Sequence, residues 1–99
     1  MTERAIFKDE VKYELKRPKM YKVILLNDDY TTMEFVVQVL VVIFHKSAAD
    51  ATRIMLDVHE KGKGIVGTYT YDVAITKIIQ VEDMAKEREF PLKAIIEEE

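Results

Sequence analysis

A run of three short polar residues, Asn27, Asp28 and Asp29, directly follows an apolar stretch and directly precedes a helix start. The apolar stretch, Met20–Leu26, predicts a buried strand because it is rich in Val, Ile and Leu. Asn and Asp tolerate turn geometry, and their side-chain oxygens accept hydrogen bonds from N–H donors. The chain therefore passes from a strand into a helix through one short polar turn.

The size and composition of the chain limit it to a single domain. It has 99 residues, of which 48% are hydrophobic, enough for a packed core. The formal net charge of −3 gives no electrostatic reason to expect binding to nucleic acid.

The chain contains no cysteine, which excludes disulfides, thiolate metal sites and thiol catalysis. The apolar stretch at residues 35–44 is too short to span a bilayer, and no membrane association is expected. The first residues contain no apolar signal core. We therefore predict a cytoplasmic protein.

Residues 1–19 differ in character from the rest of the chain. They are mostly charged and are predicted to form a flexible N-terminal extension, with a weak helix around residues 10–16 as the competing interpretation. Pro18 marks the boundary because proline and the residue before it disfavour a continuing helix. The predicted folded domain is residues 20–99.

The segment after the polar turn is ambiguous, because residues 36–44 contain enough β-branched side chains for a buried strand. A capping box at residues 31–34 favours a helix: Thr31 is the predicted N-cap and Glu34 reaches back to it. A second helix opens in the same way at Ser47 and repeats apolar residues at helical spacing, with Gly62 as its left-handed C-cap.

The rest of the chain predicts a strand, a helix and a final strand. Residues 64–70 form the second strand, with a bulge or close backbone approach at Gly67. Residues 71–89 form the third helix, which Pro91 ends, and residues 92–96 form the last strand before a solvated acidic tail at 97–99. The order β-α-α-β-α-β predicts an α/β sandwich, a three-stranded antiparallel sheet covered on one face by three helices.

The polar turn has a functional and a purely structural interpretation. Two carboxylates beside an amide, with Met33 close behind, suit a cation attached to an apolar group, such as a free peptide N-terminus with a large first side chain. Alternatively, acidic residues before a helix only cap it and complement its dipole. His59, in the last turn of the second helix, has the same two interpretations.

Catalytic, metal and cofactor sites find little support. His45 and His59 lie on different predicted elements without further ligands at metal-binding spacing, so no metal or cofactor is expected. No nucleophile and base pair is evident, and residues 62–64 are too short for a phosphate-binding loop. We expect no enzyme and no catalytic residue.

Several motifs occur in order and together resemble the ClpS family of adaptors for the ATP-dependent Clp protease. They are NDDYT-x-MEFV at residues 27–36, AT-x-IML-x-VH at 51–59, G-x-G at 62–64, G-x-YT at 67–70, A-x-TK at 74–77 and PL at 91–92. The resemblance extends from residue 20 to about residue 96. It implies an adaptor that binds substrates whose N-terminal residue is Leu, Phe, Tyr or Trp and delivers them to the N-terminal domain of the unfoldase ClpA.

The resemblance also assigns roles to individual residues. Asn27, Asp29 and His59 would hold the substrate α-amino group, with Asp28 beside them, and Met33 would reject β-branched first residues. Asp72 and Lys77 match the face that docks on the unfoldase. The predicted lining of the side-chain pocket is Leu25, Thr31, Met33, Val36, Met55, Val58 and Leu92.

Two departures from the family pattern concern the first helix. Thr32 stands where many members have proline, and Val41 and Val42 stand at commonly polar positions, where a sandwich helix should face water. These valines leave open an alternative function, a protein interaction module without an amine pocket. The default expectation for the oligomeric state is a monomer.

Overall fold

The computed structural model describes residues 18–99. The extension predicted at residues 1–19, with its competing helix, lies outside the described residues apart from Pro18 and Lys19. The described elements follow the predicted order. They are β1 (Met20–Leu26), α2 (Met33–Val42), α3 (Ala48–Lys61), β2 (Lys63–Thr70), α4 (Tyr71–Glu87) and β3 (Lys93–Glu98).

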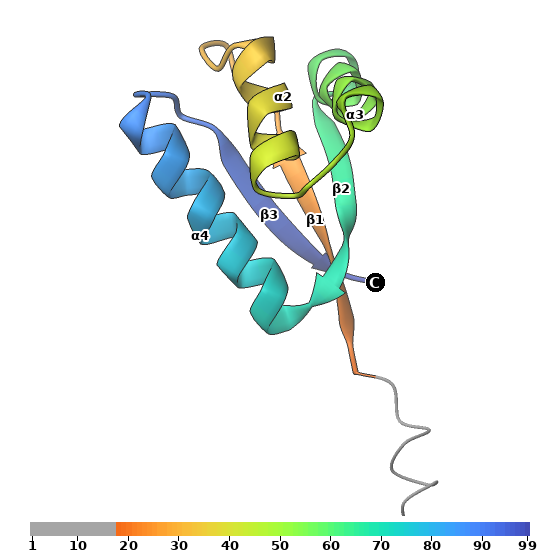
Figure 1. The fold of residues 1–99 in the computed structure, drawn as a ribbon. Coiled ribbons are helices and arrows are strands. Elements are labelled where there is room, and N and C mark those ends of the chain that lie inside the picture. Colours follow the sequence, from red (N-terminus) through yellow and green to blue (C-terminus); the bar gives the residue numbers. More distant parts are fainter. Residues whose placement is uncertain (1–17) are drawn as a thin grey trace, which may run out of the picture.

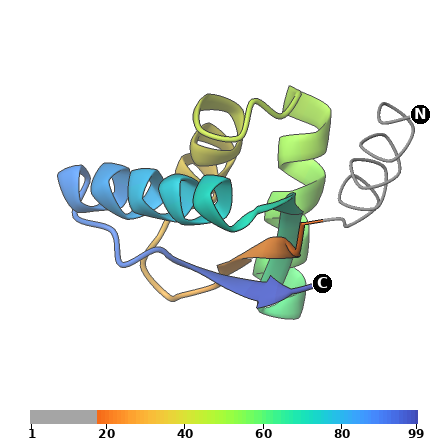
Figure 2. The same cartoon turned by 90° about the horizontal axis from the view of Figure 1, so that it is seen from below.

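The three strands form one antiparallel sheet with β1 in the centre, in the order β2-β1-β3. Helix α4 packs across the strands on one face, and α3 lies against both α2 and the edge strand β2 (Figures 1 and 2). The predicted sandwich of three antiparallel strands and three helices is confirmed. Within residues 18–99, no helix has the length and apolar character needed to cross a membrane.

The core lies between the sheet and the helices. Val23 and Leu25 of β1 are fully buried there, against the buried faces of α2, α3 and α4. Burying an aliphatic side chain of this size contributes about 1.5–3 kcal/mol. The three helices supply the contacts through Phe35, Val36, Val39, Leu40, Ala51, Ile54, Val58, Ala74, Val81 and Ala85.

Two glycines determine how α3 meets β2. Gly62 ends α3 in the left-handed conformation, with φ of 87°, as predicted. A Cβ atom on Gly64 would lie 2.7 Å from Val58 Cγ2 and 3.0 Å from the Ile54 carbonyl oxygen. The missing side chain at Gly64 therefore allows α3 to pack directly on the strand.

The predicted irregularity near Gly67 is confirmed as a bulge. Val23 pairs with Gly67 while the next residue, Ile24, pairs with Ile65, so Val66 is the extra residue of β2. Val66 is 3% exposed and belongs to the core. The bulge therefore directs one more apolar side chain toward the helices.

The start of α2 differs from the prediction. Thr32, not Thr31, is the N-cap, and its hydroxyl oxygen accepts a hydrogen bond of 3.2 Å from the backbone N–H of Phe35. The expected capping box between Thr31 and Glu34 is wrong because the Thr31 hydroxyl bonds to Asp28 instead. The helix also ends at Val42, before two buried residues that were included in the prediction.

The C-terminal part of the chain needs two further corrections. Helix α4 ends at Glu87, two residues early, because Glu89 takes a left-handed φ of 62°. Residues 97–99 are exposed, as expected, but the strand extends into them: Glu97 pairs with Lys22 and Glu98 with Tyr21. The backbone N–H of Glu99 also donates to the carbonyl of Met20 at 2.9 Å, so sheet hydrogen bonding orders this acidic segment.

We expect Gly64→Ala to destabilise the domain by about 1–3 kcal/mol, the usual cost of overpacking a close contact. The added Cβ would meet the backbone of Ile54 and the side chain of Val58. Urea unfolding measures the change, with the exposed neighbour Lys63→Ala as a control expected to stay within about 0.5 kcal/mol of the parent. An unchanged midpoint for Gly64→Ala would contradict the close approach of α3.

Candidate functional site

The loop between β1 and α2 folds around the carboxylate of Asp28. This carboxylate accepts hydrogen bonds from the backbone N–H of Tyr30 at 2.8 Å, the backbone N–H of Thr31 at 2.7 Å and the Thr31 hydroxyl at 2.7 Å. Short acidic side chains commonly stabilise turns by bonding to the backbone two or three residues ahead. Asp28 therefore fixes the shape of the loop.

A backbone hydrogen bond ties the same loop to the end of α3. The N–H of Asn27 donates to the carbonyl of Gly62 at 2.9 Å. Gly62 follows the last turn of α3, which carries His59. The sequence indicates the C-cap at Gly62 but contains no sign of this contact, which holds Asn27 near His59.

The pKa of the Asp28 carboxyl group is subject to two opposing influences. Partial burial raises the pKa of its carboxyl group, but the hydrogen bonds from Thr31 and Tyr30 favour the ionised form more strongly and hold the pKa below 3.8. The carboxylate is therefore charged at neutral pH while it accepts these bonds.

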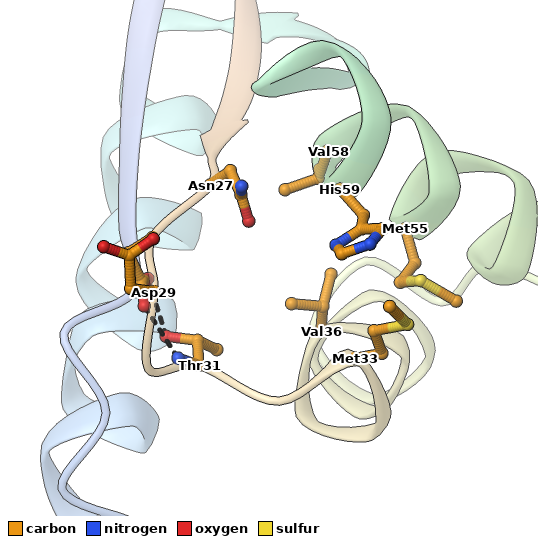
Figure 3. A pocket seen from close by; sticks show the side chains of 9 residues that line it. Asn27, Asp29, Thr31, Met33, Val36, Met55, Val58 and His59 are labelled. Atoms are coloured by element: carbon orange, nitrogen blue, oxygen red, sulfur yellow. Dashed lines mark hydrogen bonds between the residues drawn. The ribbon is translucent and has the colours of Figure 1, made fainter.

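The loop, the start of α2 and the end of α3 surround a hollow of about 280 Å³ (Figure 3). In Figure 3 the side chains of Asn27 and His59 point into the gap between the loop and α3 from opposite sides. Every lining residue was among the predicted site residues. The lining consists of Asn27, Asp28, Asp29, Thr31, Met33, Val36, Met55, Val58 and His59.

The hollow has an apolar floor and a polar rim. Val36 and Val58 are only 5% and 2% exposed and form the floor, and Met33 and Met55 lie closer to solvent. The exposed side chains of Asn27, Asp29 and His59 supply oxygen and nitrogen acceptors at the rim. Such a site suits a ligand that joins a cationic group to an apolar one.

Two predicted pocket residues are placed elsewhere. Leu25 and Leu92 are 0% and 2% exposed and belong to the core, not to the lining of the hollow. The side chain of Leu25 follows the alternation of β1 and points with Val23 toward the helices. Both residues support the structure behind the pocket wall.

The two residues expected on a docking face share helix α4. Asp72 is exposed in its first turn, and Lys77 is half-buried one to two turns further along. Both line a shallow hollow of about 200 Å³. In Figure 1 the start of α4 lies at the lower end of the molecule, whereas the β1–α2 loop lies at the upper end.

The part of the chain described here, residues 18–99, holds no cluster of three or more His, Asp or Glu side chains arranged for a metal ion. The fold and the hollow together define a small α/β domain with a surface pocket that has an apolar floor and a polar rim.

The family model described as ATP-dependent Clp protease adaptor protein ClpS matches residues 16–95, so the chain belongs to the ClpS family. An ATP-dependent Clp protease adapter protein ClpS from Acetivibrio thermocellus is 68% identical over 99 residues, which cover both chains completely. The protein of the same name from Syntrophus aciditrophicus is 61% identical over 85 residues, 86% of this chain and 79% of its own.

A solved structure supports the same family. The structure of Agrobacterium tumefaciens ClpS2 bound to L-phenylalaninamide matches with a TM-score of 0.81 and 44% identity, covering 84% of this chain and 100% of that chain. The resemblance seen in the sequence is thus confirmed. The chain is an adaptor of the Clp protease and not an enzyme.

We expect Asp28→Ala to destabilise the domain by about 1 kcal/mol, because three hydrogen bonds are lost but the site is partly screened by solvent. The folded-state pKa of Asp28 is lowered, so its contribution is present above the unfolded-state value, 3.8, and is lost as the pH falls through the folded-state value.

Denaturant unfolding of both proteins between pH 7 and pH 2.5 measures this difference. The gap between parent and Asp28→Ala should be constant near neutrality and should shrink below about pH 3.8. Asp29→Ala, beside it in the chain, is the matched control and should change stability much less. A gap that widens toward acid would refute the proposed role of the carboxylate.

Proposed function

We propose that this adaptor binds substrates bearing N-terminal Leu, Phe, Tyr or Trp, through their free α-amino group and first side chain, and delivers them to a ClpA-type unfoldase. The observation that carries the proposal is the hollow with an apolar floor and a polar rim. Agrobacterium tumefaciens ClpS2 binds L-phenylalaninamide, a molecule with a free α-amino group and an aromatic side chain. This is the ligand chemistry that the hollow suits.

The rim residues would recognise the ammonium group. Asn27 offers an amide oxygen, Asp29 a carboxylate, and His59 an imidazole nitrogen, all exposed around one opening. A hydrogen bond to a charged group contributes about 1.5–3 kcal/mol. Asp28 would act indirectly, by holding the loop in shape, because its carboxylate already accepts three hydrogen bonds within the loop.

The floor would receive the first side chain of the substrate. Burying a Leu or Phe side chain against Val36 and Val58 contributes about 1.5–3 kcal/mol. Met33 and Met55 have flexible, polarisable side chains that adapt to both aliphatic and aromatic guests. After the entropy of ordering the peptide is subtracted, an affinity of about 1 μM is expected.

Met33 would also exclude β-branched residues. Its side chain is 42% exposed at the opening, where the backbone of a bound peptide must lie. Ile and Val carry a branch directly beside the backbone and would collide with the rim, whereas Leu and Phe branch further out. Discrimination of this kind depends on a clash with the wrong ligand.

Delivery would use the face of α4 that carries Asp72 and Lys77. The start of α4 lies at the opposite end of the molecule from the β1–α2 loop (Figure 1). This separation would leave the pocket accessible while the unfoldase is bound. Residues 20–99 would form the adaptor domain, acting as a monomer. The monomeric state and the cytoplasmic location stay predictions.

The alternative is an interaction module that ignores the peptide amine and binds a partner through the outer face of α2. Val41 and Val42 are indeed 39% and 54% exposed. A surface of this kind would not distinguish a free from an acetylated N-terminus, so one comparison separates the two functions.

Peptides beginning with Leu and Phe should bind with an affinity of about 1 μM, and those beginning with Ile or acetyl-Leu at least about tenfold more weakly, a difference of about 1.4 kcal/mol. Acetylation removes the positive charge, and Ile places its branch at the rim. Fluorescence anisotropy with four otherwise identical peptides measures this. Equal binding of all four, or of none, would refute the amine pocket.

His59→Ala and Asn27→Ala should each weaken binding of a Phe peptide at least about tenfold, because each removes an acceptor for a charged donor. Glu60→Ala, an exposed neighbour on α3 outside the lining, is the control and should bind normally. Circular dichroism melts should show all three variants folded. Parent-like affinity in both rim variants would show that the amine binds elsewhere.

A further inference from the structure

Helix α2 ends beside a cation that belongs to another helix. Its C-cap is Ile43, and the carbonyl oxygen of Ile43 accepts a hydrogen bond of 2.7 Å from the Lys77 ammonium on α4. The two residues are 34 positions apart in the chain. The contact therefore joins two helices that the sequence does not connect directly.

The physical need for this cation comes from the helix itself. The last carbonyls of an α-helix lack intrahelical partners and carry a partial negative charge, which a nearby cation stabilises. The last turn of α2 contains no basic residue. Lys77 is half-buried and supplies from α4 the charge that α2 lacks.

The turn after α2 is tightly closed at the same place. His45 adopts a left-handed φ of 56°, an uncommon conformation for a residue with a side chain. The backbone N–H of Lys46 returns to the carbonyl of Leu40 at 3.0 Å. With the Lys77 contact, these bonds fix the position of the C-terminal end of α2.

The opposite end of α2 forms part of the hollow. Met33 is its first residue and Val36 lies in its first turn, and both line the hollow. A helix of ten residues is about 15 Å long and behaves as a rigid rod. A shift at the Ile43 end therefore displaces Met33 and Val36 at the pocket end.

We propose that Lys77 is a positioning residue for the peptide pocket, which holds α2 from its C-terminal end. The inference rests on the proposed peptide-binding function and adds a role that the docking assignment of Lys77 does not contain. An ammonium has three N–H donors, so the bond to Ile43 leaves donors for a docking partner. A neighbouring groove of about 440 Å³, lined in part by Val42, His45 and Lys77, gives a partner access to it.

Three variants of the full chain test the proposal, without any unfoldase present. Lys77→Met keeps the aliphatic stem but removes the donor, and Lys77→Arg keeps a cationic donor. Lys86→Met makes the same substitution at an exposed position of α4 that lies outside the predicted docking face and lines neither neighbouring hollow. Affinity for a Phe peptide is measured by anisotropy, and amide hydrogen exchange is followed along α2.

Lys77→Met should weaken peptide binding about two- to fivefold, the size of one interaction between a charge and a helix end, and should speed amide exchange in the last turn of α2. Lys77→Arg should restore most of both properties, and Lys86→Met should match the parent in both. Rescue by Arg distinguishes positioning by a cation from a loss of packing.

Parent-like peptide affinity in Lys77→Met would overturn the proposal, as would unchanged amide exchange in α2. Equal losses in Lys77→Met and Lys86→Met would also overturn it, because they would indicate a general effect of replacing a lysine on α4. A parent protein that binds no peptide would instead refute the proposed function, so the two failures are distinguishable.

Discussion

The carboxylate of Asp28 holds the β1–α2 loop together, and the geometry of the candidate site depends on it. By accepting three hydrogen bonds from Tyr30 and Thr31, it forces the chain to reverse within a few residues. Without this turn, Asn27 at the end of β1 and Met33 at the start of α2 could not line the same hollow. The site is thus organised by a residue whose own hydrogen-bonding capacity is largely used within the protein.

The second half of the site is placed by packing. Gly64 lets α3 approach β2 so closely that a single Cβ would collide with Val58, and the Gly62 carbonyl receives the N–H of Asn27. These two contacts bring the His59 end of α3 to the polar loop. The apolar floor of the hollow is then an outlying part of the core, since Val36 and Val58 belong to both.

Features governed by local interactions could be predicted from the sequence. The bounds of β1, the left-handed cap at Gly62 and the cap at Ser47 were correct because each depends on residues close in the chain. The predicted cap at Thr31 was wrong because local sequence does not distinguish between the two neighbouring threonines. Both threonines can cap a helix, and the decision came from a competing acceptor, Asp28, in the folded loop.

The order of elements, the family and the residue types around the hollow could all be predicted, because motif spacing and apolar periodicity are properties of the chain. The packing of the folded chain places Leu25 and Leu92 in the core instead of in the lining of the pocket. The same packing brings Lys77 to the end of α2, 34 positions away in the chain. Such contacts depend on how helices and strands pack, and local sequence carries no signal for a hydrogen bond between distant elements.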